Sequence, residues 1–345
     1  MENILLSVIL PTYNMERFLR KCLESIQKQT YQHFEVIIVV DGATDSSYAI
    51  AQEFEQEDVR FHAIWQENAG SGPARNNGLR RAKGEVIMFI DPDDWIEADM
   101  FKHFIEAYQQ DKPDLILSGY TENYESNGKM TETALPLKQE RFYELEAVRK
   151  AYLPLYFEEA VSAPTRKLYK KKIIDKYGVV FPALRRSQDI VFNYCYYRWI
   201  ESAVVLSDVS YHYHVDDASY LLKLKEGYDR TIALLFNGIL EMYESWGMEI
   251  PAEEMKRLLN RFFTLVGYYI ESCIMQSISF GKLLKDQTIC YVVKNAEPLD
   301  VYHKCLQSAL RSNNLKAARR IVQVKIFVKK NMKLLFSKLR QIRKF

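Results

Sequence analysis

Three carboxylates follow directly after an unbroken apolar run. Val86–Ile90 is apolar throughout, and Asp91, Asp93 and Asp94 come next, around Pro92. Such a run predicts a strand buried on both faces of a parallel sheet, where ligands bind beyond the carboxyl ends of the strands. Carboxylates this close repel one another unless a cation neutralises them, and Mg²⁺ or Mn²⁺ held together with substrate phosphates fits that need. The alternative is a solvated turn in which Asp93 or Asp94 caps the next helix.

The pattern of an apolar run followed by polar residues occurs three times before this cluster. Residues 5–10, 34–40 and 61–65 have the length and composition of buried strands, and residues 15–29 show helical spacing of apolar side chains. Strands and helices that alternate at short intervals predict an open α/β sheet with right-handed crossovers. The polar loops should therefore meet at one edge of the sheet.

The pattern continues beyond the acidic cluster. Residues 114–118 predict another strand, and residues 120–136 predict a hairpin that turns at Ser126-Asn127-Gly128. Residues 204–206 and 209–214 have the alternation of two further strands. Every strand predicted so far lies before residue 219, so we expect a first domain of residues 1–219.

The last third of the sequence differs in kind. From about Leu221 it has dense apolar residues at helical spacing and no chemical motif, so we expect a helical domain over residues 220–345. The predicted helices before its tail cover residues 232–246, 252–276 and 301–310.

The tail of the chain is basic. Residues 311–345 hold 12 of the 47 Lys and Arg residues and no acid, so the remainder has 35 basic and 45 acidic side chains. Apolar residues recur there every three or four positions, at Ile321, Val324, Val328, Met332, Leu335, Leu339 and Ile342. This predicts a basic amphipathic helix over about residues 314–345, lying on an anionic membrane surface. The alternatives are a helix that forms a homo-oligomer and a core helix with solvated lysines. Nucleic acid is disfavoured as a partner, because the acidic body would repel phosphate.

Composition indicates a globular protein of two domains. The chain has 345 residues, of which 48% are hydrophobic and 27% charged. Its five cysteines contain no Cys-x-x-Cys pair, which favours reduced thiols over a disulfide framework or a zinc site. No signal peptide and no uncharged apolar stretch of about 18 residues is found. We therefore expect a cytoplasmic protein without a transmembrane helix.

Four blocks of the sequence together resemble a known family. They are Ser7–Asn14, Val39–Asp45, Glu67–Gly70 with Ala74–Asn76, and Phe89–Trp95. In this order they are similar to the inverting family 2 glycosyltransferases of the GT-A fold, an open, mostly parallel, Rossmann-like sheet. The resemblance covers roughly residues 4–219. It implies a nucleotide-sugar half at about residues 1–95 and an acceptor half at about residues 96–219.

The resemblance implies roles for the first two polar loops. Pro11, Thr12, Tyr13 and Asn14 match the loop that lines the base pocket in this family, so Tyr13 would stack on uracil. Asp41 matches an acid that forms a hydrogen bond with the nucleoside. The alternative for Tyr13 is an aromatic residue of an ordinary turn.

The next two loops match the part of the family that holds the diphosphate. Asn68 and Arg75 belong to blocks that bind the nucleotide sugar. Asp91-Pro92-Asp93 matches the Asp-x-Asp motif, in which Asp91 and Asp93 hold the ribose and a divalent metal, Mn²⁺ or Mg²⁺. The alternative for Arg75 is an ion pair on the surface of a helix.

Asp189 matches the catalytic base of the family. It precedes Phe192-Asn193 at the family spacing, and in the family this acid accepts the proton of the attacking hydroxyl. Its alternative role is to cap the helix that follows. Residues 211–214 and Ser219 resemble the closing block of the family, which implies that His214 assists the metal or the leaving group. A structural His is the alternative.

Two positions depart from the family pattern. Val40 and Gln188 stand where the family has acids, and Val40 either extends a strand or changes nucleotide binding. The resemblance implies a transferase that moves a hexose or N-acetylhexosamine from a UDP-sugar to a hydroxyl acceptor, and the basic tail favours a lipid-linked glycan as that acceptor. It would act in capsule, exopolysaccharide or cell-wall synthesis, at the inner face of the cell membrane. The two departures favour the alternative, an inactive partner that stabilises another transferase.

Overall fold

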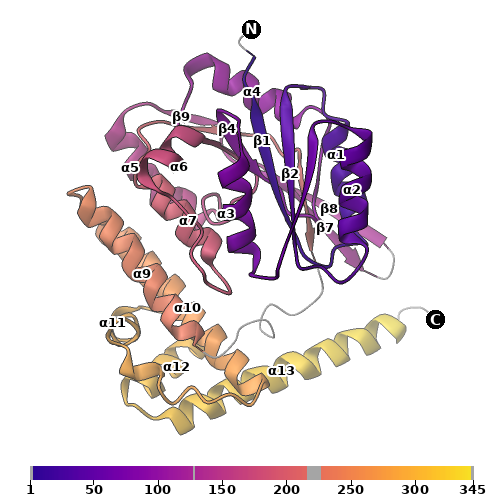
Figure 1. Cartoon of the computed structure of the whole chain (residues 1–345). Helices are drawn as coiled ribbons and strands as arrows, with labels where there is room; N and C mark the ends of the chain where they lie inside the picture. The colour runs from indigo at the N-terminus through magenta and orange to yellow at the C-terminus, as the bar shows by residue number, and fades with distance from the viewer. Residues whose placement is uncertain (1–2, 127–128, 216–226, 343–345) are drawn as a thin grey trace. The chain divides into compact units, whose positions relative to one another are not determined.

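The computed structural model describes residues 3–126, 129–215 and 227–342 of the chain (Figure 1). The chain forms two compact units, Met1–Asp217 and Ala218–Phe345. Asn127 and Gly128 of the predicted turn, Ser219 and the predicted domain boundary lie outside the described residues. The division of the first domain into a nucleotide-sugar half and an acceptor half stays a prediction.

The first unit is built on an eight-stranded sheet with the order β3-β2-β1-β4-β10-β6-β11-β9. Its strands are β1 (Leu6–Thr12), β2 (Phe34–Asp41), β3 (Phe61–Gln66), β4 (Val86–Phe89), β6 (Leu115–Ser118), β9 (Glu140–Phe142), β10 (Lys167–Lys170) and β11 (Ala203–Leu206). Strands β10 and β9 are antiparallel to their neighbours, and the other pairs are parallel. The sheet is therefore mixed and mostly parallel, as predicted.

Strand β1 is longer than predicted, because it continues through Pro11 to Thr12. The pairs Pro11↔Val39 and Thr12↔Val40 keep it on β2, whereas its pairing with β4 ends at Ile9. Proline lacks a backbone N–H and is tolerated where one edge of a strand is unpaired. The predicted strand of residues 5–10 therefore extends to Thr12, and the polar loop begins at Tyr13.

Seven helices accompany the sheets in the described part of this unit. They are α1 (Leu19–Gln27), α2 (Ser47–Glu57), α3 (Ser71–Arg81), α4 (Met100–Asp111), α5 (Leu145–Phe157), α6 (Lys171–Tyr177) and α7 (Gln188–Tyr197). Alternate strand residues point to opposite faces. Val8, Val36 and Met88 share one buried cluster with residues of α1, α2 and α4. Phe89 points to the other face and packs on Phe192 of α7 at 5.5 Å between ring centroids.

Helix α3 lies very close to β1 on this second face. A Cβ atom on Gly78 would come within 2.5 Å of Ile9 Cγ2, so only glycine permits this approach. Gly70, at φ 99°, stands at the N-cap position of the helix. The close approach brings the side chain of Arg75, one turn from Gly78, to the tip of β4.

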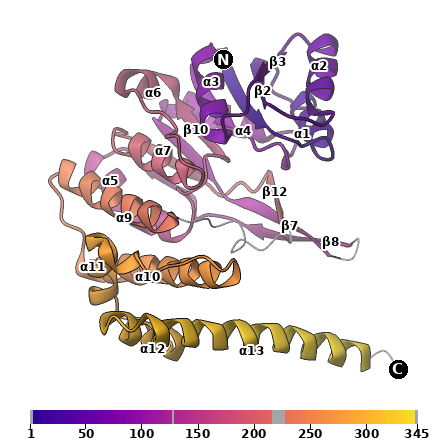
Figure 2. The same ribbon diagram turned by 60° about the horizontal axis from the view of Figure 1, so that its bottom comes forward.

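A second sheet of four strands has the order β5-β12-β7-β8. Its strands are β5 (Trp95–Ile96), β7 (Tyr120–Ser126), β8 (Lys129–Leu135) and β12 (Tyr211–Val215). Strands β7 and β8 form the predicted antiparallel hairpin, and Figure 2 shows β12 beside it. Strand β5 had not been predicted, and it joins the end of the acidic loop to β12.

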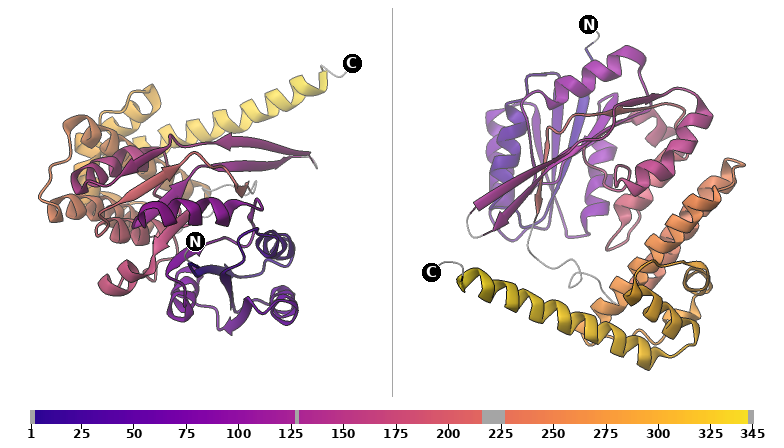
Figure 3. Two further views of the ribbon diagram at one scale, coloured as in Figure 1. Left: turned by 90° about the horizontal axis from the view of Figure 1, so that it is seen from above. Right: turned by 180° about the vertical axis from the view of Figure 1, so that it is seen from behind.

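The second unit is helical in the part that the structure describes, as predicted. Its elements are α9 (Tyr228–Ser245), α10 (Ala252–Met275), the 3₁₀ turn Leu283–Lys285, α11 (Gln287–Asn295), α12 (Val301–Arg311) and α13 (Leu315–Ile342). Figure 3 shows α13, in yellow, extending beyond the other helices of this unit. Across the described ranges, no helix combines the length and apolarity needed to cross a membrane.

Helix α13 has a packed face and an exposed apolar face. Ala318 and Val322 are fully buried, so the start of the helix belongs to the core of this unit. Val324 and Phe327 are 62% and 67% exposed, and Val328 is also exposed. The expected stripe from Ile321 onward is thus not what packs the helix in place. The side chains of Met332, Leu335, Leu339 and Ile342 lie outside the described part.

Candidate active site

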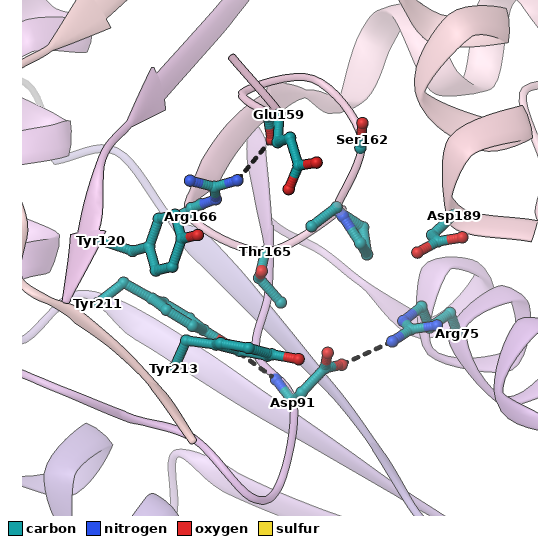
Figure 4. Close-up of a pocket in the computed structure, with 12 residues that line it drawn as sticks. Arg75, Asp91, Tyr120, Glu159, Ser162, Thr165, Arg166, Asp189, Tyr211 and Tyr213 are labelled. Atoms are coloured by element: carbon teal, nitrogen blue, oxygen red, sulfur yellow. Dashed lines mark hydrogen bonds and ion pairs between the residues drawn. The ribbon is translucent and has the colours of Figure 1, made fainter. Parts of the chain in front are cut away.

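A cavity of about 270 Å³ opens at the carboxyl end of β4. Figure 4 shows Asp91 and Arg75 on its floor, with Asp189 beside Arg75. The remaining wall consists of the segment that precedes β10 and of tyrosines from the second sheet, and it includes Glu159, Ser162, Thr165, Arg166, Tyr120, Tyr211 and Tyr213. Three of the residues predicted for the site, Arg75, Asp91 and Asp189, therefore line one cavity.

Asp91 is held by partners from three different elements. Its Oδ1 accepts a hydrogen bond from Arg75 Nη2 at 2.6 Å, its N–H donates to the Tyr211 hydroxyl at 3.3 Å, and its carbonyl faces the Cys22 thiol. Arg75 is buried, so the alternative of an ion pair on the helix surface is wrong. The guanidinium supplies the cation that the acidic cluster was expected to need, at least for Asp91.

Asp94 is a buried structural acid. Its Oδ2 accepts a hydrogen bond from the Tyr211 hydroxyl, and its Oδ1 accepts one from the backbone N–H of His214 at 2.9 Å. Burial, followed by the charges of Asp93 and Asp91, raises the pKa of Asp94 well above its usual range. The alternative, in which Asp93 or Asp94 caps the next helix, is wrong, because α4 begins at Met100 with Asp99 at its N-cap position.

The acidic loop can contribute to a metal site but does not complete one. Among the described residues there is no group of three or more His, Cys, Asp or Glu side chains that could hold a metal ion. Asp93 is partly exposed, and Asp91 keeps a second carboxylate oxygen beyond the one that binds Arg75. Hard oxygen ligands of this kind suit Mg²⁺ or Mn²⁺, which commonly bind one or two carboxylates and complete their shell with phosphates and water. The residues therefore fit a metal that arrives with a diphosphate.

Asp189 lies in the first turn of α7, one residue beyond the helix start. Ser187 occupies the N-cap position, with φ at 60°, so the role of Asp189 as a cap is excluded. Burial raises the pKa of Asp189, and the positive charge of Arg75 opposes that rise. Gln188 is buried and donates a hydrogen bond to Ser71 Oγ at the start of α3. This departure from the family pattern therefore joins α7 to the helix that carries Arg75.

Asp41 organises the loop between β3 and α3. It is 2% exposed, and its carboxylate accepts hydrogen bonds from Gln66 Nε2 and from the N–H groups of Ala69 and Gly70, at 2.7–2.9 Å. Asn68 Nδ2 donates to the Asp41 carbonyl at 3.1 Å. Both predicted residues are thus tied to one another, and their direct contact with a nucleoside stays a prediction.

The loop after β1 is exposed and stands apart from the cavity lining. Tyr13 is 48% exposed, and Asn14, at φ 51°, accepts a hydrogen bond from the Thr44 N–H at 2.8 Å. Pro11 and Thr12 are buried in β1. Val40 is fully buried within β2 and pairs with Trp65, so this departure from the family extends the strand, the first of the two predicted explanations.

His214 contributes its backbone to the site through Asp94. Its imidazole packs on the Phe18 ring, with 5.0 Å between ring centroids. These contacts are structural, and a role of the ring toward metal or leaving group stays a prediction.

Sequence reasoning missed the segment that forms the far wall of the cavity. Residues 159–166 carry no motif, yet side chains from β10 and α7 hold their carbonyl groups. Asn193 Nδ2 donates to the carbonyls of Ser162 and Asp189 at 2.8 and 2.9 Å. Lys167 Nζ donates to the Ala163 carbonyl. The Tyr169 hydroxyl lies 2.6 Å from Asn193 Oδ1 and 3.1 Å from the Pro164 carbonyl, and its single proton serves one at a time.

Comparison with known proteins places the chain in a family. Residues 7–178 match the family described as Glycosyl transferase family 2. The chain is 31% identical over 273 residues to the putative glycosyltransferase EpsH of Bacillus subtilis, which covers 77% of this chain and 76% of that protein. The chain therefore belongs to glycosyltransferase family 2, and its class of enzyme is glycosyltransferase.

Two further relatives extend this result. The glycosyltransferase GlyG of Streptococcus pneumoniae is 29% identical over 296 residues, covering 84% of this chain and 95% of GlyG. The crystal structure of residues 1–349 of TarS from Staphylococcus aureus, in complex with UDP-GlcNAc, matches with a TM-score of 0.65 and 20% identity. That match covers 92% of this chain and 90% of the TarS chain. It establishes the GT-A fold with C-terminal helices, as predicted.

Proposed function

We propose that the protein is a metal-dependent, inverting glycosyltransferase that moves a hexose or N-acetylhexosamine from a UDP-sugar to a hydroxyl group of a glycan. The observation that carries this proposal is the cavity that has Asp91 and Asp189 in its lining, because a single displacement needs groups on both sides of the sugar. The names of the relatives support it: TarS is a poly(ribitol-phosphate) beta-N-acetylglucosaminyltransferase, and it was crystallised with UDP-GlcNAc.

Asp189 is the proposed general base. Its carboxylate accepts the proton of the acceptor hydroxyl while the acceptor oxygen forms a bond to the anomeric carbon. The bond from that carbon to the diphosphate breaks on the opposite face, and UDP leaves with the bonding electrons. Burial raises the pKa of Asp189 toward the working pH, which strengthens it as a base, and Arg75 limits the rise so that the ionised form is available.

Asp91 and Asp93 are the proposed residues for the diphosphate end of the donor. They would hold Mn²⁺ or Mg²⁺, which neutralises the charge that develops on the leaving diphosphate. Arg75, through its ion pair with Asp91, fixes the direction of that carboxylate. Tyr13, Asn14, Asp41, Asn68 and the buried pair Pro11-Thr12 are the proposed nucleoside-binding set, and His214 is the proposed contact to the diphosphate.

The acceptor is proposed to be a lipid-linked glycan in bacterial polysaccharide or cell-wall synthesis. The relative TarS, a poly(ribitol-phosphate) beta-N-acetylglucosaminyltransferase, supports a polymer as acceptor, and the exposed apolar face of helix α13 supports a place at the membrane. Its exposed Val324, Phe327 and Val328 are accompanied by the exposed cations Lys316, Arg319, Arg320 and Lys329. Such a face binds an anionic membrane surface, where each basic residue contributes about 1 kcal/mol. The protein would therefore work at the inner face of the cell membrane.

Calorimetric titration of UDP into the protein, with Mn²⁺ and then with EDTA, tests the donor site. Binding that requires Mn²⁺ is the expected result. If UDP, GDP and dTDP all fail to bind, the catalytic proposal is refuted, and the inactive partner that Val40 and Gln188 first suggested takes its place.

A further inference from the structure

Two adjacent buried cations stand at the end of the segment that forms the cavity wall. Arg166 is 6% exposed and Lys167 is 1% exposed. Within the described ranges neither one forms an ion pair with a carboxylate. Arg166 Nη2 donates to the Glu159 carbonyl at 2.6 Å, its guanidinium lies 4.3 Å from the centre of the Tyr120 ring, and Lys167 binds the Ala163 carbonyl. A buried charge without an opposite charge is costly, so these cations need an explanation.

Lys167 is explained by the wall itself. Lys167 is not part of the cavity lining, its ammonium group donates to the Ala163 carbonyl, and burial lowers the pKa of the amine. Asn193 fixes the neighbouring Ser162 carbonyl. These contacts make residues 159–166 a preformed wall rather than a loose loop.

Arg166 differs because it lines the cavity. Figure 4 shows its guanidinium beside Tyr120, across the cavity from Arg75 and Asp189. Only one of its donor groups has a protein hydrogen bond in the described part of the chain, and the fork of an arginine carries five N–H donors. Arg166 and Glu159 both have left-handed backbone conformations, at φ 53° and 59°, which residues other than glycine rarely adopt. The hydrogen bond to Glu159 and the contact with Tyr120 hold this side chain in the cavity lining, and its remaining donors are available to a ligand.

The other polar groups of the cavity differ from Arg166 in their partners or in their exposure. Arg75 is paired with Asp91, so its charge is balanced within the protein. The Ser162 hydroxyl is buried, lines the cavity and has no hydrogen-bond partner. Glu159, the third acid of the lining, is exposed and therefore screened by water. Arg166 therefore forms no ion pair with a carboxylate in the described residues, and the charge of Glu159 acts on it only from beyond ion-pair distance.

We infer that this cavity binds a sugar that carries a carboxylate, a hexuronic acid of the nucleotide-sugar donor, and that Arg166 is the residue that selects it. The planar guanidinium matches a carboxylate with two parallel hydrogen bonds, whereas a neutral hydroxymethyl group offers one weaker acceptor. The face of the Tyr120 ring packs against the guanidinium and holds its orientation. This inference rests on the proposed function, because it names the donor for the same site.

The test compares donors that differ only at C6. UDP-glucose is paired with UDP-glucuronic acid, and UDP-galactose with UDP-galacturonic acid, each titrated calorimetrically in the presence of Mn²⁺. The wild-type protein should bind the acid of at least one pair about 10- to 100-fold more tightly than its neutral partner, the ratio expected for a hydrogen bond between charged groups. Arg166→Gln should abolish that ratio, and Arg166→Lys should retain part of it. UDP alone should bind all variants within about twofold.

Lys172→Gln is the matched control, since it removes an exposed cation of α6 and should keep the full ratio. Equal affinities within both pairs for the wild-type protein, with UDP still binding, overturn the inference and leave the proposed function intact. The inference is also overturned, with the proposed function intact, if Arg166→Gln keeps the preference for the acid. Loss of UDP binding by the wild-type protein overturns both. If Arg166→Gln does not fold, the wild-type pairs and Arg166→Lys decide.

Discussion

Tyr211→Phe tests whether the acidic loop is held in place by one buried hydroxyl. The hydroxyl donates to the buried carboxylate of Asp94 and accepts from the Asp91 N–H at 3.3 Å. A hydrogen bond to an ionised group contributes about 1.5–3 kcal/mol and one between neutral groups about 1 kcal/mol. Phenylalanine fills the same space, so the loss is confined to these hydrogen bonds.

The effect of Tyr211→Phe should depend on pH, and its sign follows from Asp94. Folding raises the pKa of Asp94 above the ordinary 3.8, and the Tyr211 hydroxyl opposes that rise. The native state therefore prefers the protonated acid, and stability falls as pH rises through the raised pKa. Without the hydroxyl, ionised Asp94 is less stabilised, so the variant should lose more stability at high pH. We expect a loss of about 1 kcal/mol where Asp94 is protonated and about 2–3 kcal/mol where it is ionised.

Thermal unfolding, followed by circular dichroism at a series of pH values from acid to alkaline, measures this difference between the two ends of the series. For a unit of this size, 1 kcal/mol corresponds to about 2–4 °C, so the loss should grow from about 2–4 °C to roughly 4–12 °C. Tyr108→Phe is the matched control. The hydroxyl of the buried Tyr108 donates to Glu85 Oε1 at 2.6 Å, and Glu85 is exposed. That variant should show a small loss that does not change between the two ends of the series. A loss for Tyr211→Phe that is equal at both ends, or below about 1 °C, refutes the reasoning.

Three further variants test the proposed roles. Asp189→Asn should reduce turnover by roughly 10²- to 10⁴-fold while UDP still binds, and unchanged turnover removes Asp189 from the mechanism. Because folding raises the pKa of Asp189, the variant should also melt at a higher temperature, with a gain that grows from pH 4 to pH 7. Asp93→Ala should abolish the Mn²⁺-dependent part of UDP binding in calorimetry, and equal affinity with and without EDTA in the wild type contradicts the metal site. Val324→Glu with Val328→Glu should release the protein from anionic liposomes in flotation, whereas Gln323→Glu should not; equal flotation of all forms assigns α13 to oligomer formation instead.

The sequence predicted the sheet well because its signals are local. Continuous apolar runs such as Val86–Ile90, bounded by turn residues, favour a strand that is buried on both faces. The same logic located the polar loops at the strand ends. It did not show that β10 enters the sheet antiparallel between β4 and β6, because the direction of a strand is set by the path of the chain around it and not by its own residues.

The site was predicted in part for a similar reason. Asp91, Arg75 and Asp189 each stand in a motif, and the cavity brings them together. Arg166 stands in no motif, and its place in the lining depends on a left-handed backbone that only the packed wall imposes. Asp94 resembled a solvated cap in the sequence, and it became a buried acid because Tyr211, more than a hundred residues later, reaches it.

The two places where strands from before and after residue 112 meet are unusually short. The β4–β10 ladder and the β5–β12 ladder have two residue pairs each, whereas β1 and β2 share seven pairs and β7 and β8 share seven. Phe89, Tyr169, Phe181 and Phe192 fill the space behind the first of these junctions. Few backbone hydrogen bonds would have to be rebuilt if the later segment were replaced by that of a homologue. A chimera joined at Lys112, with the four aromatic residues kept, should therefore fold, and it would exchange Arg166 and Asp189 together while Asp91 and Arg75 stay in place.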